Sequence, residues 1–267
     1  MSSKRRVRFP GALGAELAGR LETPPFEPRG VALMAHCFTC SKDAKGIVRI
    51  ARVLVEEGYA VFRFDFTGIG ESGGEFSATT FSTNVADLVA AAAYLRSEYR
   101  APDLLVGHSL GGAAVLAGAN RIPEARAVAT LAAPSDTHHL EHSLLRMAPE
   151  LAHEDEVEVD VVGRSIRIGR PLLEDLATID LEAAIRHLGL PLMIFHSPQD
   201  EIVGIDHASK IYRAASHPKS FISLDGADHL FLARESDAIY VGKMLAVWAA
   251  RYLPGIGDTT LVVSPPD

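Results

Sequence analysis

Residues 104–112 read LLVGHSLGG, and the three residues that follow are Ala, Ala and Val. This is a short apolar strand, a Gly-X-Ser-X-Gly turn and the start of a helix built from small residues. A serine at such a sharp strand-to-helix turn is forced into a strained backbone conformation, and Gly107 and Gly111 are the small neighbours that two closely approaching backbones require. The pattern predicts Ser109 as a nucleophile at the amino end of a helix, where backbone N–H groups stabilise negative charge.

A serine hydroxyl is a poor nucleophile at neutral pH unless a base removes its proton, so a histidine is required. After a turn of this kind, the chain order is serine, then an acid after a later strand, then histidine after the last strand. The last predicted strand, residues 220–224, runs into a glycine-containing loop that holds His229. His229 is therefore the predicted base.

The acid that orients the base is expected in the loop after the preceding predicted strand, residues 192–196. Asp200 lies in that loop. Its carboxylate would hold His229 in the productive tautomer and stabilise the imidazolium that forms during acyl transfer. Glu201 is the nearest competitor, and Asp136, after an earlier predicted strand, is a second one.

Two backbone N–H groups are expected to face the substrate oxygen that becomes negative. One belongs to Leu110, directly after the nucleophile. The second is expected from the loop after predicted strand 31–36, where the N–H of Phe38 is favoured and that of Cys37 is the neighbouring alternative. His36 and His108 are interpreted as structural residues at strand ends.

Short apolar segments and helical patterns alternate from residue 31 onward, which predicts an α/β fold with a mainly parallel, twisted sheet and helices on both faces. The predicted strands are residues 31–36, 60–66, 104–107, 127–132, 192–196 and 220–224. The predicted helices are residues 42–58, 83–99, 110–120, 205–216 and 237–252. Residues 7–23 are predicted to be two strands joined around Gly11, forming an antiparallel edge of the sheet.

Residues 136–190 interrupt this alternation and are predicted to form a small lid insertion over the carboxyl edge of the sheet. Within them, a period-two pattern predicts a β-hairpin. Its tip is expected at Gly163-Arg164, with cross-strand pairs Val161–Ile166, Val159–Ile168 and Asp160–Arg167. The acidic run 154–160 is interpreted as the solvated face of this hairpin rather than as a binding site.

The loop at residues 64–74 has a Gly-X-Gly pair after a strand, as a dinucleotide-binding turn does. Gly73 stands three residues after Gly70 but is not in the right place to open a helix, since the next predicted helix begins only at residue 83. The sequence therefore predicts a tight surface loop whose turns are held by Asp65 and Ser72.

The chain of 267 residues is 48% hydrophobic and 22% charged, so residues 1–267 are expected to form a single domain, with 254–267 as a tail or linker. A formal charge of −8 gives no long-range attraction to nucleic acid. The sequence has no run of about eighteen apolar residues, so it predicts no membrane-spanning helix. The two cysteines, Cys37 and Cys40, cannot build a disulfide framework, which favours a reducing, cytoplasmic location.

Together these residues resemble the α/β-hydrolase family over about residues 6–253. More narrowly, AHCFTCSK at 35–42 and RFDFTG at 63–68 look like the hydrolase half of bacterial proteins that fuse such a domain to an OsmC-like peroxide-reducing domain. The resemblance implies an esterase or acyl-hydrolase. The modest lid favours small to medium carboxylic esters, cleaved through an acyl-enzyme without a metal or organic cofactor.

Two functions of other classes stay open at this point. Cys37 and Cys40 have the Cys-X-X-Cys spacing of a thiol redox pair, although small packing residues in a loop are the favoured interpretation. The fold could also serve as a non-catalytic scaffold, since fold alone does not establish activity. The expected partner is a small-molecule ester, with no nucleic acid and no membrane, while an OsmC-like domain and a homo-oligomer stay open.

Overall fold

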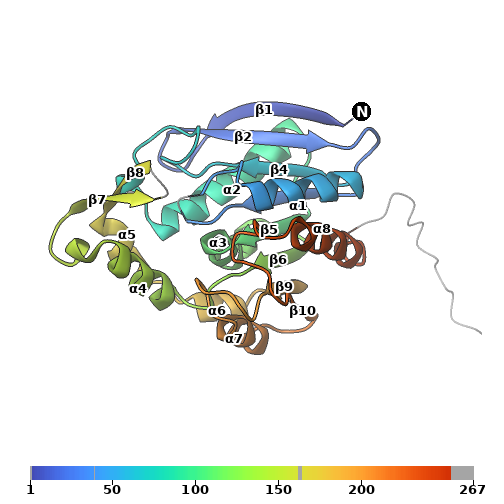
Figure 1. Ribbon diagram of the computed structural model, residues 1–267. Helices are drawn as coiled ribbons and strands as arrows, with labels where there is room; N and C mark the ends of the chain where they lie inside the picture. Colours follow the sequence, from blue (N-terminus) through green and yellow to red (C-terminus); the bar gives the residue numbers. More distant parts are fainter. Residues whose placement is uncertain (1, 39, 162–163, 254–267) are drawn as a thin grey trace, which may run out of the picture.

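The computed structural model describes residues 2–38, 40–161 and 164–253, and within them one large sheet has eight strands (Figure 1). The strand order is β1-β2-β4-β3-β5-β6-β9-β10. The β1–β2 and β2–β4 pairs are antiparallel, and the pairs from β4 to β10 along this order are parallel. The strands of this sheet are β1 (Ser3–Pro10), β2 (Glu16–Thr23), β3 (Val31–Ala35), β4 (Ala60–Phe64), β5 (Leu104–His108), β6 (Ala127–Leu131), β9 (Leu192–His196) and β10 (Lys219–Ser223).

The inner strands are mostly apolar and are buried along their whole length, because both faces of the sheet are covered. Alternate side chains, such as Leu33 and Met34 of β3, enter two separate cores. Helices α1 (Lys45–Glu56) and α8 (Glu235–Ala249) pack together over one face. Helices α2 (Phe81–Glu98), α3 (Leu110–Gly118), α6 (Leu181–Arg186) and α7 (Asp206–Ala214) belong to the core of the other face.

The fold predicted from the sequence is confirmed. All six strands predicted from residue 31 onward and all five predicted helices form, with ends shifted by a few residues. The predicted antiparallel edge also forms, as β1 and β2, joined by a turn in which the Gly11 N–H donates to the carbonyl oxygen of Ala15. Short 3-10 helices follow β4 and α3, namely η1 (Phe76–Ala78) and η2 (Ala119–Arg121).

The segment between β6 and β9 carries a separate two-stranded sheet, as predicted. The elements of this segment are α4 (Thr137–Met147), η3 (Pro149–Ala152), the two strands β7 (Glu156–Val161) and β8 (Arg164–Gly169), α5 (Arg170–Leu176) and α6. The hairpin docks on η1, since a Cβ at Gly169 would overlap the carbonyl oxygen of Ser77. The acidic side chains of 154–160 are exposed, as expected.

The predicted register of this hairpin is wrong by two residues. The observed pairs are Val159–Ile166, Val157–Ile168, Glu158–Arg167 and Asp160–Ser165, and Val161 pairs with Arg164. Arg164 is thus the first residue of β8 rather than part of the tip, while Gly163 lies outside the described residues. A shift by two residues keeps every side chain on the same face, so the apolar pattern does not distinguish the two registers.

Candidate active site

Ser109 lies between β5 and α3 with φ 53° and ψ −121°, a left-handed conformation that is strained for any residue with a Cβ. Its N–H donates to the carbonyl oxygen of Leu131 in β6, at 2.9 Å. Gly107 has no room for a side chain, because a Cβ there would overlap the backbone of Gly111. The strained turn and the steric need for glycine, both expected from the sequence, are confirmed.

The start of α3 is packed against the end of β3. A Cβ at Gly111 would overlap the carbonyl oxygens of Ala35 and His36. Leu110 is the first helical residue, and the first N–H groups of a helix have no partner within it. The structure therefore brings the loop that begins at His36, and carries Phe38, to the first turn of α3.

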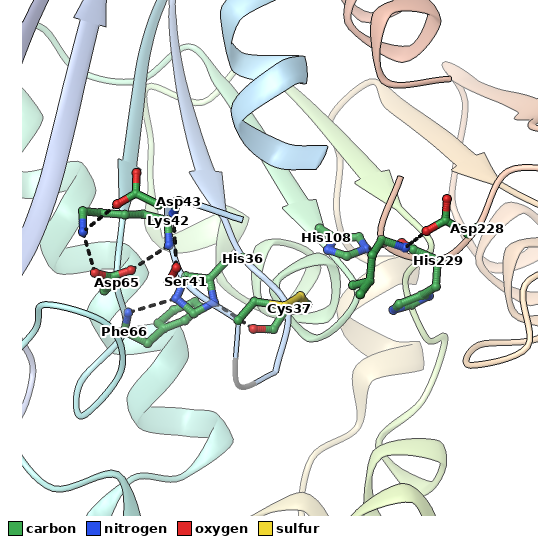
Figure 2. Close-up of a disulfide and its surroundings, with 12 residues drawn as sticks. His36, Cys37, Ser41, Lys42, Asp43, Asp65, Phe66, His108, Asp228 and His229 are labelled. Carbon is green, nitrogen blue, oxygen red and sulfur yellow. Dashed lines mark hydrogen bonds and ion pairs between the residues drawn. A yellow bond between two sulfur atoms is a disulfide. The ribbon is translucent and has the colours of Figure 1, made fainter. Parts of the chain in front are cut away.

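This loop is closed by a disulfide between Cys37 and Cys40, whose Cα atoms are 5.3 Å apart (Figure 2). The Cys40 N–H also donates to the Cys37 carbonyl oxygen at 3.2 Å, as in a tight turn. The favoured interpretation of the two cysteines as small packing residues did not include this bond, which forms because the turn brings them within bonding distance. The Phe38 ring packs against the ring of Phe76 in η1, with 5.6 Å between centroids.

The far end of the same loop is fixed by a buried charge cluster. The Lys42 ammonium contacts Asp65 at 2.8 Å and Glu71 at 2.7 Å, and the Lys42 N–H donates to the other Asp65 oxygen at 2.6 Å. Burial acts to lower the pKa of Lys42, but these hydrogen bonds outweigh it and raise the pKa above its ordinary value. Lys42 therefore stays charged.

Asp65 and Ser72 hold the turns of the loop after β4, as predicted. The Ser72 hydroxyl donates to the Asp65 carbonyl oxygen at 2.6 Å, and the Glu71 N–H donates to the Asp65 carboxylate at 2.9 Å. The expectation of a surface position is wrong for Asp65, which is fully buried. Its charge is compensated by Lys42, which the sequence places 23 residues earlier.

His229 and Asp200 meet at the carboxyl edge of the sheet, where Nδ1 of His229 lies 2.8 Å from Oδ2 of Asp200. The other oxygen, Oδ1, accepts from the N–H groups of Ile202 and Val203, each at 2.9 Å. Burial acts to raise the pKa of Asp200, but the hydrogen bond from His229 and the two backbone bonds lower it below its ordinary value. The carboxylate is ionised at neutral pH, so Nδ1 carries the hydrogen and Nε2 is left to accept a proton.

The two competing acids do not contact His229. Glu201 is exposed. Asp136 caps α4 by accepting from the His139 N–H at 3.0 Å, and it also accepts from the Ser135 hydroxyl at 2.9 Å. Its closest histidine ring nitrogen is Nδ1 of His207, 3.8 Å away. Among the three candidates, the geometry favours Asp200.

The loop after β10, which carries His229 (the base loop), is bonded to the loop after β9, which carries Asp200 (the acid loop). The base loop is also bonded to β5. The Gly226 N–H donates to the Gln199 side-chain oxygen at 2.6 Å. His108, the last residue of β5, places Nε2 at 2.8 Å from the His229 carbonyl oxygen. No direct hydrogen bond between the Ser109 hydroxyl and His229 occurs among the described residues, a common state of such a pair before substrate binds. His108 is the contact that holds the loop carrying His229 at the end of β5, next to Ser109.

The sequence indicates a structural place for His108 and no role for His196, yet His108 contacts the loop that carries His229 and His196 contacts the loop that carries Asp200. The signal available in the sequence was their position, each the last residue of an apolar strand whose following loop carries a predicted site residue. That signal shows where they lie but not which group they bond.

Three comparisons place this arrangement among known proteins. Residues 27–154 match the Hydrolase_4 family model, described as serine aminopeptidase, S33. The chain is 48% identical to the esterase domain of a Rhodothermus marinus protein; the superposition covers 94% of this chain and 100% of that one, with a TM-score of 0.79.

More distant relatives share the fold or part of the sequence. The structure of Est1E from Butyrivibrio proteoclasticus with bound ferulic acid has a TM-score of 0.79 at 21% identity, covering 92% of this chain and 99% of that one. A monoacylglycerol lipase from Mycolicibacterium smegmatis is 28% identical over 142 residues, 52% of this chain. The match spans 49% of the length of that lipase. None of the helices in the described part of the chain has the length and apolarity needed to cross a bilayer.

Proposed function

Because this chain belongs to the α/β-hydrolase family and is a serine hydrolase of the carboxylesterase type, we propose that Ser109, His229 and Asp200 cleave carboxylic esters through an acyl-enzyme. The observation that carries the proposal is the 2.8 Å contact between His229 and Asp200, at the same sheet edge as the strained Ser109 turn. Each of the three residues follows a different strand of one parallel sheet.

The reaction has two halves. In the first, Nε2 of His229 takes the hydroxyl proton of Ser109 as the oxygen attacks the ester carbonyl, and the protonated ring then gives that proton to the departing alcohol. In the second, water attacks the acyl-enzyme, His229 takes a proton from it, and the acid leaves as Ser109 recovers its hydrogen. Asp200 stays ionised and stabilises the imidazolium in both halves.

The oxyanion of each tetrahedral intermediate would lie between the N–H groups of Leu110 and Phe38. Support comes from the contact of the first turn of α3 with the end of β3, since that contact brings the two backbones together. The Cys37–Cys40 disulfide on one side and the Phe76 ring on the other restrict the loop that carries Phe38. Donors held in advance stabilise the charge without reorganising during the reaction.

The substrate we propose is a small to medium carboxylic ester. Large apolar side chains are exposed within three residues of Asp200 and His229, namely Ile202, Leu230 and Leu232. An apolar acyl or alkyl group would cover them on binding. Residues 136–190, proposed as the lid, supply a compact insert with its own hairpin rather than a long apolar cap. The monoacylglycerol lipase of Mycolicibacterium smegmatis acts, by its name, on monoacylglycerols, which are carboxylic esters.

The remaining expectations stay predictions. They are a cytoplasmic location, an OsmC-like partner domain, self-association, and a tail or linker at residues 254–267, which lie outside the described residues.

The test is hydrolysis of p-nitrophenyl esters of graded acyl length, together with labelling by a fluorophosphonate probe. Ser109→Ala should lose both turnover and labelling. Ser135→Ala is the matched control, because the Ser135 hydroxyl also contacts a histidine ring, at 2.9 Å from Nδ1 of His207, but its partners His207 and Asp136 are not among the three proposed catalytic residues. A wild-type enzyme that neither turns over nor labels, or a Ser109→Ala variant that still labels, would refute the proposal.

A further inference from the structure

Two histidines end strands of the central sheet and are almost completely buried beside the proposed catalytic residues. His108 ends β5 and is 2% exposed, and His196 ends β9 and is 0% exposed. Neither takes part in the proton transfers described above. Each one nevertheless bonds a loop that carries a member of the proposed triad.

His108 bonds the base loop. Its Nε2 lies 2.8 Å from the carbonyl oxygen of His229, and a carbonyl only accepts, so Nε2 carries the hydrogen. The ring of His108 lies next to the ring of His229 (Figure 2), with 5.0 Å between centroids. The His108 ring also packs against the ring of Phe231, with 5.8 Å between centroids. Among the described residues, Nδ1 of His108 is buried without a partner. A proton there would have no acceptor, and burial lowers the pKa of His108 to about 3, so the ring is neutral.

The base loop needs such an anchor because its own backbone is strained. Phe231, two residues after His229, has φ 56°, in the left-handed region that a bulky side chain disfavours. Such a conformation persists only where surrounding contacts hold it. The hydrogen bond from His108 attaches the loop to β5 at the residue that must aim its ring at Ser109.

His196 does the same for the acid loop. Its Nε2 lies 2.7 Å from the carbonyl oxygen of Val203, while the Val203 N–H donates to Oδ1 of Asp200. The Asp200 oxygen that faces His229 is 3.8 Å from Nε2 of His196, beyond hydrogen-bond distance, so His196 does not compete for it. Burial also lowers the pKa of His196.

We propose that His108 and His196 are positioning residues, buried neutral imidazoles whose Nε2–H groups fix the base loop and the acid loop on the carboxyl edge of the sheet. The proposal rests on the proposed function of Ser109, His229 and Asp200. The proposal differs from a plain packing role in one respect. If the two histidines only filled space, the volume of the ring would matter, whereas here the kcat of ester hydrolysis depends on the Nε2–H donor.

The experiment compares two substitutions at each position. His108→Leu and His196→Leu fill the space without a donor, whereas His108→Gln and His196→Gln restore an N–H near the place of Nε2. Thr130→Val, in β6 between the two strands, is the control for a buried change, since the Thr130 hydroxyl has no partner among the described residues. Each variant is assayed for kcat and KM, normalised to the fraction that a fluorophosphonate labels.

We expect the leucine variants to lose roughly 10- to 100-fold in kcat, because a displacement of about 1 Å at a reacting group costs up to roughly 100-fold. KM should change by less than about threefold, and the glutamine variants should recover most of the lost kcat. Equal damage from leucine and glutamine, or labelled leucine variants with kcat within about twofold of wild type, would overturn the proposal.

A second measurement does not depend on the variants folding. Imidazole ¹⁵N NMR of the wild-type protein at about pH 7 should show both rings as neutral Nε2–H tautomers. A hydrogen on Nδ1, or a protonated ring, would refute the assignment. A wild-type enzyme that hydrolyses no ester would instead sink the proposed function while leaving the two tautomers as found.

Discussion

Replacing Asp200 by asparagine tests the proposed triad most directly, because the three hydrogen bonds to its carboxylate predict the orientation of the new amide. In one orientation the amide oxygen takes the place of Oδ1 and keeps the two backbone donors, Ile202 and Val203. The amide NH₂ then donates to Nδ1 of His229, which forces the ring hydrogen onto Nε2. A base with a hydrogen on Nε2 cannot accept the proton of Ser109.

The other orientation keeps the productive tautomer but faces the NH₂ toward two backbone N–H groups. Each unsatisfied buried donor costs about 1–3 kcal/mol, so this orientation lies about 2–6 kcal/mol higher. At about 1.4 kcal/mol per factor of ten, the active fraction falls to between roughly 1 in 30 and roughly 1 in 10⁴. Asp200→Asn should lower kcat by that factor, with the melting temperature held close to wild type.

The assay is steady-state hydrolysis of p-nitrophenyl butyrate, with fluorophosphonate labelling rates as a second readout. Glu201→Gln is the matched control, since the exposed neighbour should change kcat by less than about twofold. Asp136→Asn serves the same purpose for the other competing acid. An Asp200→Asn enzyme within about threefold of wild type, or a Glu201→Gln enzyme that loses as much, would refute the assignment of Asp200.

Three further changes have definite expected outcomes. Lys42→Met leaves the carboxylate of Asp65 buried without its cation, so the free energy of unfolding measured by urea denaturation should fall by about 3–5 kcal/mol. A loss below about 1 kcal/mol would contradict the buried pairing. Reduction of the Cys37–Cys40 disulfide removes a short cross-link and should lower the free energy of unfolding by no more than about 2 kcal/mol, while kcat falls several-fold. An unchanged kcat would mean that the cross-link does not support the loop that carries Phe38. Gly107→Ala should abolish soluble, fluorophosphonate-reactive enzyme, because the added methyl overlaps the next helix, and a stable active variant would contradict the packing.

The position of the site could be predicted from the sequence because parallel strands end at one edge of a sheet. Apolar runs locate the strands, and Ser109, Asp200 and His229 each follow such a run within a few residues. Once the strand order is that of a parallel α/β sheet, the three loops must meet. The contact between His229 and Asp200 follows from this logic, and so does the steric need for glycine beside Ser109.

Other features could not be predicted because the same sequence pattern fits more than one structure. Cys-X-X-Cys spacing is compatible with two thiols or one disulfide, and only the folded loop shows that Cys37 and Cys40 are linked. A hairpin register shifted by two residues buries the same side chains, so Val159 could face either Ile168 or Ile166. The burial of Asp65 depends on Lys42, a partner that only the folded chain brings near.

Three strands of the sheet, β3, β5 and β9, end at or just before a buried histidine, and this recurrence has a physical reason. His36 bonds the Cys37 carbonyl oxygen through Nδ1 at 2.7 Å and accepts from the Phe66 N–H at Nε2, while His108 and His196 donate from Nε2. An imidazole is large enough to reach from a strand end into the next loop, and burial keeps it neutral. A lysine or arginine in place of His108 or His196 would add a positive charge near Asp200 that competes with His229 for its carboxylate. A neutral donor holds each loop without disturbing the hydrogen bond between His229 and Asp200, on which the proposed chemistry depends.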